Sequence, residues 1–285
     1  MKRIFLLLAV AIITTGSLSA QVFKRQKHEL SVHAGAGLST LQYELQTGKH
    51  SNGIGFQVGG GYAFYFLPSV ALRTGLEMSF YNASAKLTNF TDSYDVQASS
   101  VVNNYTYTYN IDKYNESQQS LYFNIPLMLQ FQTGRTYIFY GAVGGKVGIP
   151  LTATARTKKY EIATKGYFPQ EGRTYDDLPQ FGFGTYEYLK GSTRLDNFKL
   201  QFMLAAEAGL KWKIRKGNDI YTGVYLDYGL NNVLDTNDKR FVTSVLSADK
   251  PPMSPIIESQ YKGSPFTEKI NPLAVGLRVR FTFLQ

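Results

Sequence analysis

Seven ionisable residues lie within segments that are otherwise rich in apolar side chains, and they have the clearest chemical potential in the sequence. They are three acids and four bases: Arg73, Glu77, Lys146, Glu207, Asp227, Arg278 and Arg280. Charged side chains that leave water are tolerated only when they are paired with one another. We therefore predict that these residues form a hydrogen-bonded network of ion pairs in an enclosed interior.

Histidine is the other candidate for chemistry. The three histidines, His28, His33 and His50, have no metal-ligand spacing. His33 lies on the polar face of its segment and could serve as a catalytic base, but a base needs a partnered nucleophile or acid within hydrogen-bond reach. We favour a buried histidine with satisfied hydrogen bonds, and we expect no catalytic residue, no metal site and no cofactor.

The glycine-rich stretch GAVGGKVG, from Gly141 to Gly148, approaches the pattern of a phosphate-binding loop. The Walker pattern would need glycine at Tyr140 and serine or threonine at Val147, and it would have to follow a strand rather than lie within one. Glycines that let a narrow barrel pack closely explain the stretch better than nucleotide binding does.

The segments that carry these residues alternate strictly between apolar and smaller or polar side chains. Residues 121–131 and 137–151 both show this rhythm, and Thr133, Gly134 and Arg135 separate them as a tight turn. Alternation is the signature of a β-strand with one apolar face. Both runs exceed the roughly five or six residues of strands in soluble sheets. They suit the approximately 9–11 residues of a tilted strand that crosses a bilayer.

Six further segments repeat the pattern, which gives eight predicted strands. They are residues 30–38, 54–66, 70–80, 198–214, 220–230 and 273–283. The connections are short after the second, fourth and sixth strands and longer after the others. Outer-membrane barrels show this asymmetry between short periplasmic turns and long extracellular loops. Residues 101–111 also alternate; we prefer to place them in a hairpin that extends the third and fourth strands, with ten strands as the alternative.

The sorting of side chains between the two strand faces predicts which face meets lipid. Arginine or lysine on the lipid face costs about 2–4 kcal/mol near the middle of a bilayer, so the charged residues are expected to point inward. An open sheet edge in hydrocarbon would leave backbone groups unpaired, which requires closure. We predict an all-β, transmembrane, antiparallel up-and-down barrel. Eight strands enclose only enough space for side chains, so we expect no wide pore.

Aromatic residues near the strand ends are expected to form girdles at the two membrane interfaces. They are Tyr62, Phe64, Phe66, Phe80, Tyr81, Phe131, Tyr137, Phe139, Trp212, Phe281 and Phe283.

Residues 1–20 have the pattern of a cleavable secretory signal. Lys2 and Arg3 precede an apolar run over residues 4–13, and small residues end at Ala20, where we expect cleavage. Residues 21–285 are then expected to form a single barrel domain in the outer membrane. The chain has no cysteine, which excludes a disulfide-stapled secreted domain.

The net charge of +9 does not indicate nucleic-acid binding, because no groove of basic and aromatic residues is evident. Two of those charges belong to the signal. Several others are expected at the periplasmic edge of the barrel, where they can meet anionic lipid headgroups. This predicted basic edge consists of Lys24, Arg25, Lys27, Arg135, Arg215 and Lys216.

Four stretches resemble the OmpA-like and PorT-like outer-membrane β-barrel proteins of Gram-negative envelopes. They are SLYFNIPLMLQF with its central Ile125-Pro126-Leu127, the following TYIFYGAVGG, LDYGLNNV at residues 226–233, and LRVRFTF at residues 277–283. Barrels of this family usually end on an aromatic residue that the assembly machinery recognises, whereas here Leu284 and Gln285 follow Phe283. The resemblance implies the barrel architecture and carries over no catalytic residue.

The expected function is that of a monomeric outer-membrane barrel with a lumen filled by side chains. Its partners would be outer-membrane lipids and an extracellular ligand or envelope protein, contacted through the long loops, and not nucleic acid. The resemblance implies one alternative, an accessory barrel for protein secretion or envelope assembly. The other alternative is an outer-membrane lipid or peptide hydrolase or acyltransferase centred on His33.

Overall fold

The computed structural model describes residues 27–97, 103–134, 137–215, 218–235, 238–247 and 249–284. The predicted signal sequence and its cleavage after Ala20 fall outside these ranges. So do Lys24, Arg25, Arg135 and Lys216 of the predicted basic edge. Within the described residues, no helix is both long enough and apolar enough to cross a membrane.

The described chain is built almost entirely of β-strands. In chain order the strands are β1 (His28–Gln42), β2 (Lys49–Asn52), β3 (Ile54–Leu67), β4 (Val70–Val96), β5 (Tyr105–Thr133), β6 (Ile138–Thr157), β7 (Tyr160–Phe168), β8 (Arg173–Tyr175), β9 (Gly184–Tyr188), β10 (Gly191–Arg194), β11 (Gln201–Arg215), β12 (Asn218–Gly229), β13 (Lys239–Arg240), β14 (Ser259–Tyr261), β15 (Ser264–Pro265) and β16 (Asn271–Leu284). Two single-turn 3-10 helices, η2 (Pro179–Phe181) and η3 (Ile256–Glu258), lie in the connections.

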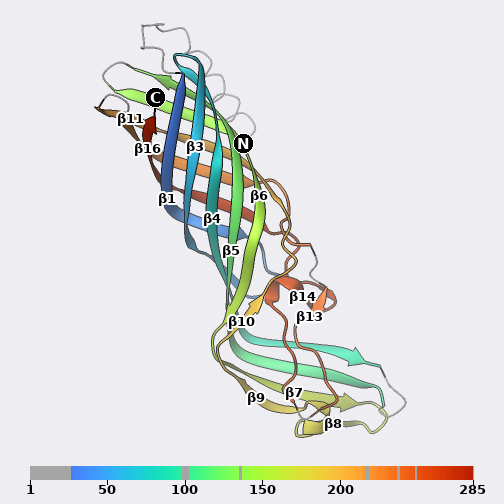
Figure 1. Cartoon of the computed structure of the whole chain (residues 1–285). Coiled ribbons are helices and arrows are strands. Elements are labelled where there is room, and N and C mark those ends of the chain that lie inside the picture. The colour runs from blue at the N-terminus through green and yellow to red at the C-terminus, as the bar shows by residue number, and fades with distance from the viewer. Residues whose placement is uncertain are drawn as a thin grey trace.

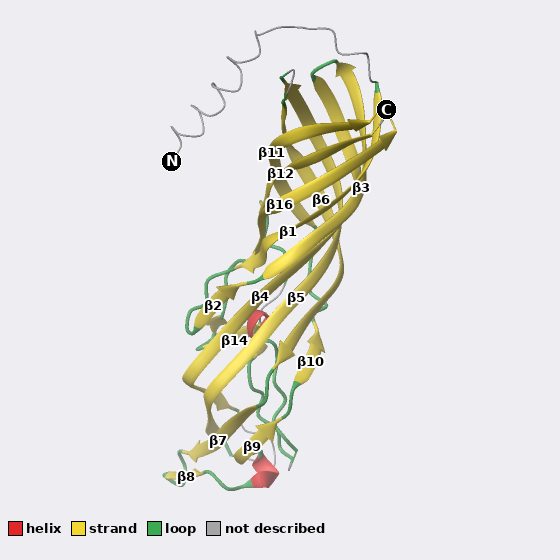
Figure 2. Ribbon diagram, turned by 90° about the vertical axis from the view of Figure 1, so that its left-hand side faces the viewer, coloured by secondary structure: helices red, strands yellow, loops and turns green. Residues whose placement is uncertain are grey.

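Eight of these strands form a closed antiparallel ring, which confirms the predicted up-and-down barrel. Its members are β1, β3, β4, β5, β6, β11, β12 and β16. The last strand returns to the first, so that Val32 on β1 faces Phe281 on β16. The ring is visible in Figure 1 and, from the side, in Figure 2. We call the end with the short connections the turn end and the opposite end the loop end.

The outer surface of the ring is apolar, and the inner surface carries the charges. On β16, Leu277 is 69 % exposed whereas the adjacent Arg278 is 5 % exposed. The alternation of strand side chains between two faces produces this contrast. The same outward belt includes Phe56, Leu76, Leu127, Val143, Leu204 and Val224. The predicted separation of apolar and ionic faces is therefore correct.

Two details of the sequence prediction are wrong. Tyr81 does not belong to an aromatic girdle, because it lies on the inward face of β4 and is fully buried. There it packs edge-on against Tyr122, with 6.0 Å between ring centroids. The sixth predicted strand also begins later than Phe198, since β11 starts at Gln201 and Phe198 forms only an isolated bridge with Leu234.

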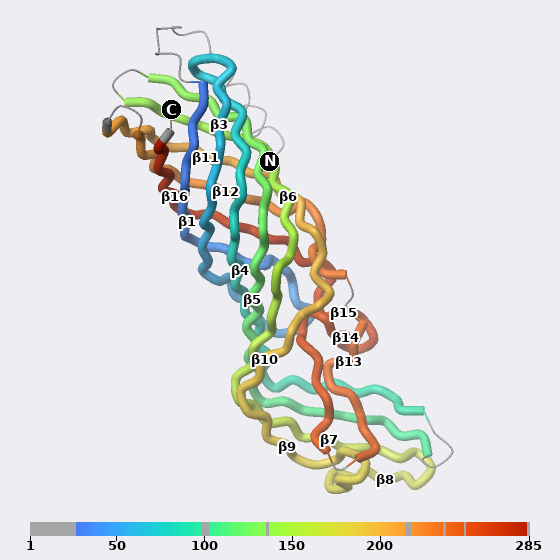
Figure 3. Tube along the Cα trace, viewed as in Figure 1, coloured from blue at the N-terminus to red at the C-terminus, as the bar shows by residue number. Residues whose placement is uncertain are grey.

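Strands β4 and β5 continue far beyond the ring, which confirms the preferred hairpin extension over a ten-stranded barrel. They contain 27 and 29 residues, and their ladder extends to the pair Val96 and Tyr105. Strand β5 alone covers roughly 90 Å at the usual rise per residue. Strands β7, β8 and β9 add to this extension, which bends away from the barrel (Figure 3). Much of the long connections predicted after the third and fifth strands is thus regular sheet.

The extension forms a folded unit that we call the loop lobe, made of the described residues 84–97, 103–116, 158–190, 238–247 and 249–268. It has a core of sixteen buried residues, ten of them aromatic. Phe90 of β4 packs against Phe241 and Phe266 of the last connection, with centroids 5.8 and 5.6 Å apart. Much of the tyrosine and phenylalanine of the chain therefore stabilises the lobe rather than the membrane interfaces.

A second core closes the mouth of the barrel at the loop end. Tyr81 and Tyr122 from the ring meet Val233, Ile257 and Ile270 from the last connection, and all five are buried. The segment between β12 and β16 thereby covers the lumen and joins the barrel to the loop lobe.

Candidate functional site

The structure joins six of the seven predicted ionisable residues in one network. On β6, the Lys146 Nζ atom lies 2.6 Å from Oε1 of Glu77 and 2.7 Å from Oδ2 of Asp227. Arg278 on β16 bridges the two glutamates, at 2.8 Å from Glu77 and 3.2 Å from Glu207. Each side chain enters the lumen because it occupies an inward position of its strand.

Arg73 completes this network from β4. Its Nη2 atom lies 2.5 Å from Oε2 of Glu207, and its Nη1 atom donates to Oε1 of the same carboxylate at 3.4 Å. The hydroxyl of Tyr140 donates a further hydrogen bond to Glu207 at 2.8 Å. Glu207 is therefore held by three neighbours at once.

Arg280 is the predicted member that the structure places differently. Its guanidinium donates to Oε1 of Gln130 at 2.8 Å and lies 3.8 Å from the ring centroid of Tyr221. Among the described residues, no carboxylate lies within ion-pair distance of it. A planar cation can stack on an aromatic face, which stabilises it where water is excluded.

A second cluster near the turn end contains residues that the sequence prediction did not include. Lys211 lies 2.9 Å from Asp219 and 3.5 Å from Glu29, whose carboxylate also accepts the hydroxyl of Tyr221 at 2.8 Å. Glu29 and Lys211 share the inward parity of their strands, so strand parity was the signal that pointed to them. With this cluster, the buried ionisable side chains of the described barrel comprise five acids and five bases.

His33 faces the same lumen. Its Nε2 atom lies 3.0 Å from Oε2 of Glu77, a carboxylate already bound to Lys146 and Arg278. The cavity beside it has a volume of about 20 Å³, which suffices for a single water molecule. Gly59 permits the close approach of the imidazole, since a Cβ atom there would lie 2.8 Å from His33 Cε1. This cavity offers no room for a lipid or peptide substrate.

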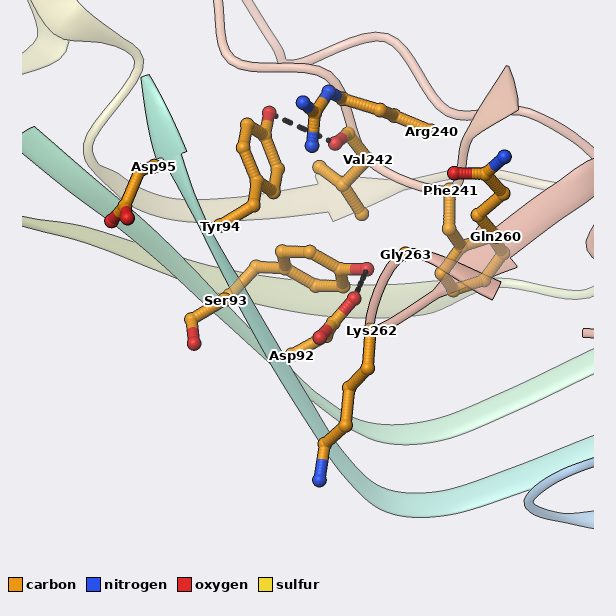
Figure 4. Close-up of a pocket in the computed structure, with 11 residues that line it drawn as sticks. Asp92, Ser93, Tyr94, Asp95, Arg240, Phe241, Val242, Gln260, Lys262 and Gly263 are labelled. Atoms are coloured by element: carbon orange, nitrogen blue, oxygen red, sulfur yellow. Dashed lines mark hydrogen bonds between the residues drawn. The ribbon is translucent and has the colours of Figure 1, made fainter. Parts of the chain in front are cut away.

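The loop lobe contains a larger cavity, of about 470 Å³, within the range of small-molecule sites. One wall is residues 92–95 of β4, and the other consists of residues 240–242 with Gln260, Lys262 and Gly263 (Figure 4). At its base, the Tyr109 hydroxyl donates to Oδ2 of Asp92 at 3.1 Å. The guanidinium of Arg240 lies 3.8 Å from the ring centroid of Tyr94. Sequence reasoning missed this site because its walls come from distant connections.

No protein-family model matches the chain, and no curated protein matches it. Several solved structures are similar, among them the three that follow. A major outer membrane protein from Thermus thermophilus is 13 % identical to this chain, with a TM-score of 0.38. The alignment covers 90 % of this chain and 100 % of that chain. The attachment invasion locus protein Ail of Yersinia pestis, with the heparin analogue sucrose octasulfate, has 13 % identity, a TM-score of 0.31 and the same coverage. Ail alone has 14 % identity, a TM-score of 0.30 and again that coverage.

Proposed function

We propose that the chain is an integral outer-membrane barrel with a closed lumen, and that its loop lobe recognises a ligand or partner outside the cell. The observation that carries this proposal is the contrast between the two parts. The lumen is filled by side chains and capped by a buried core, whereas the lobe is folded and contains a cavity. A barrel without a wide pore would not act as a transporter of large molecules, so its function would depend on binding to its exposed loop lobe.

The apolar belt supports a membrane location. Each of the eight ring strands exposes large apolar side chains on its outward face, and among them Ile54 is 77 % exposed and Leu127 is 57 % exposed. Such a surface suits acyl chains, which makes outer-membrane lipids its partners. The turn end would face the periplasm, and the loop end with its lobe would face the exterior.

We propose a role in binding rather than in catalysis. His33 is committed to Glu77, and the space beside it holds about one water molecule. Replacement of His33 by alanine is therefore expected to leave the lipid and peptide profile of the envelope unchanged. A changed profile would support the hydrolase or acyltransferase alternative.

An accessory role in protein secretion or envelope assembly is the second candidate. It is favoured by the size of the loop lobe, whose core of sixteen residues exceeds what a small-ligand site requires. Secretion components that co-purify with the protein in mild detergent, and are lost on mutation of the lobe, would support it. Purification of the protein as a monomer without secretion components would favour the ligand-binding role.

The orientation is tested by epitope insertion in intact cells. An epitope after Gly172, which lies between β7 and β8 with no atom within 4 Å of a Cβ built there, should bind antibody on intact cells. The same epitope between Leu67 and Val70, in a short connection at the turn end, should bind only after the outer membrane is permeabilised. The reverse pattern would contradict the proposal, as would stable conductance steps from the purified protein in planar bilayers.

A further inference from the structure

The cavity in the loop lobe lies along the edge of a strand. Four consecutive residues of β4 line it: Asp92, Ser93, Tyr94 and Asp95. Consecutive residues of a strand point to opposite faces, so a cavity that contacts four in a row cannot lie over one face only. Their burial follows this rule, because Asp92 is buried, Tyr94 is half-buried, and Ser93 and Asp95 are exposed. The cavity therefore runs beside about 13 Å of strand edge.

This edge of β4 has no strand partner within the part of the chain that the structure describes. One side of β4 pairs with β5 up to Val96. The other side pairs with β3 as far as Phe80 and then with β2 between Ala83 and Lys86. Beyond Lys86, no described strand continues the sheet on that side. The backbone groups there are available to another extended chain, as at any open sheet edge.

The opposite wall provides side-chain contacts. Arg240 stacks on Tyr94, and the Tyr94 hydroxyl donates to the backbone carbonyl of Val242 at 3.2 Å. Lys262, on the other facing segment, also lines the cavity, and its side chain extends away from Arg240 (Figure 4). The cavity, which we call the groove from here on, is thus lined by acidic residues along β4 and by basic residues along the facing loops.

Asp92 adds an independent indication of a missing partner. It is 8 % exposed, and its Oδ1 atom has no hydrogen-bond partner. Its other oxygen accepts the Tyr109 hydroxyl. A buried acceptor without a partner is costly, and a ligand that donates a hydrogen bond would relieve this cost.

We propose that the groove binds an extended peptide segment, which adds to β4 as an edge strand. The main chain of the peptide would pair with residues 91–95, and two basic side chains on opposite faces of the peptide would meet Asp92 and Asp95. An acidic side chain would meet Arg240 on the other wall. The inference rests on the proposed function, because a peptide reaches this edge only if the loop lobe faces outward.

The two aspartates also explain why the edge does not pair indiscriminately. Charged side chains on edge strands oppose association with arbitrary strands. A peptide with a basic residue at the matching position removes this repulsion, so the charges select the ligand. Charge complementarity then favours a peptide of mixed sign over a second copy of this chain, whose own edge carries the same two aspartates.

The test uses the full chain in detergent micelles and an array of random ten-residue peptides. A peptide with a basic residue should be selected, and its binding should slow amide exchange in residues 91–95. Methylation of alternate backbone amides of that peptide should weaken its Kd at least tenfold, because it removes the donors for strand pairing. Asp95→Lys should weaken the Kd by a similar factor, and the matched control Asp176→Lys, on an exposed residue of the lobe outside the groove, should not.

Four results would overturn the proposal: no selected peptide, equal binding of the methylated peptide, protection of amides elsewhere, or self-association of the unliganded chain through residues 91–95. The epitope experiment separates these failures from failure of the proposed function. If Gly172 is labelled on intact cells and no peptide binds, the lobe is exposed but its edge is not a peptide site.

Discussion

Glu207 is a carboxylate of the lumen network that joins three other side chains. It accepts hydrogen bonds from Arg73, Arg278 and Tyr140 in a space from which water is largely excluded. Its removal would leave two guanidinium groups without this counter-ion. An uncompensated buried charge destabilises a protein far more than the loss of an exposed ion pair does.

We expect Glu207→Ala to lower the free energy of unfolding by about 3–5 kcal/mol. Urea titration in lipid vesicles would measure it, with the fluorescence of Trp212, the only tryptophan of the chain, as the signal. The matched control is Glu187→Ala, which breaks a pair with Lys159 whose side chains are 51 % and 60 % exposed. This control should cost less than about 1 kcal/mol. Similar losses for both variants would show that the lumen pairs contribute little.

Glu116 in the loop lobe is a buried acid that has no cationic hydrogen-bond partner among the residues that the structure describes. Its carboxylate accepts hydrogen bonds from Gln118, the backbone amide of Ile256 and Tyr114. Burial nevertheless raises the pKa of Glu116 above its usual value, and Glu258 nearby acts in the same direction. Because Ile256 begins η3, its hydrogen bond to Glu116 connects β5 to the segment between β12 and β16 that covers the lumen.

This raised pKa predicts the direction of a pH effect on the lobe. The folded lobe binds the Glu116 proton more tightly than the unfolded chain does. The contribution to stability is therefore greatest below the ordinary pKa of glutamate and decreases as the pH rises through the interval up to the raised pKa. In melting curves followed by tyrosine near-UV circular dichroism, the wild type should lose more stability between pH 4 and pH 8 than Glu116→Gln. Identical pH profiles would contradict the assignment.

The sequence predicted which residues enter the lumen, but not which of these residues pair with one another. Parity placed Glu77 and Arg278 on one face because a strand has only two faces. The choice between Glu207 and Gln130 as a partner of Arg280 depends on the stagger of strands around the ring, which the sequence does not state. For the same reason the cluster of Lys211 with Asp219 was not anticipated.

At the scale of elements, the apolar face of each ring strand determined where the strand would be found. The alternation of apolar and polar residues predicted the bounds of β3 and β12 to within two residues at either end. It was least informative in β4 beyond Phe80, because a strand outside the membrane has no need of a continuous apolar face. Residues such as Thr106 and Thr108 then alternate with buried tyrosines instead.

The outward face of β5 provides a direct test of the lipid contact. We expect Leu127→Arg to lower the free energy of unfolding in lipid vesicles by about 2–4 kcal/mol, because the charge would lie within the hydrocarbon. Leu189→Arg in the loop lobe is the control, since Leu189 is even more exposed, at 72 %, but lies outside the ring. If the two substitutions had equal effects, the outward face of β5 would not be in contact with lipid.

At the scale of the whole molecule, three units follow one another along the long axis: a barrel, a core that covers its mouth, and the loop lobe (Figure 2). Closure and a filled lumen were predictable, because eight strands and a two-faced pattern allow little else. The loop lobe was not, because its core combines Phe90 and Tyr109 with Phe241 and Phe266, which come from separate connections. No local pattern indicates that these segments meet.

The central claim is that the belt of the barrel meets lipid while the lobe meets water. The chain has no cysteine, so single cysteines can carry nitroxide labels at belt positions Val275, Leu277 and Val279 and at lobe positions Leu189 and Leu246. In lipid vesicles, the belt labels should collide more often with oxygen than with a water-soluble nickel reagent, and the lobe labels should show the opposite preference. Belt labels that the nickel reagent reaches as readily as lobe labels would contradict the account.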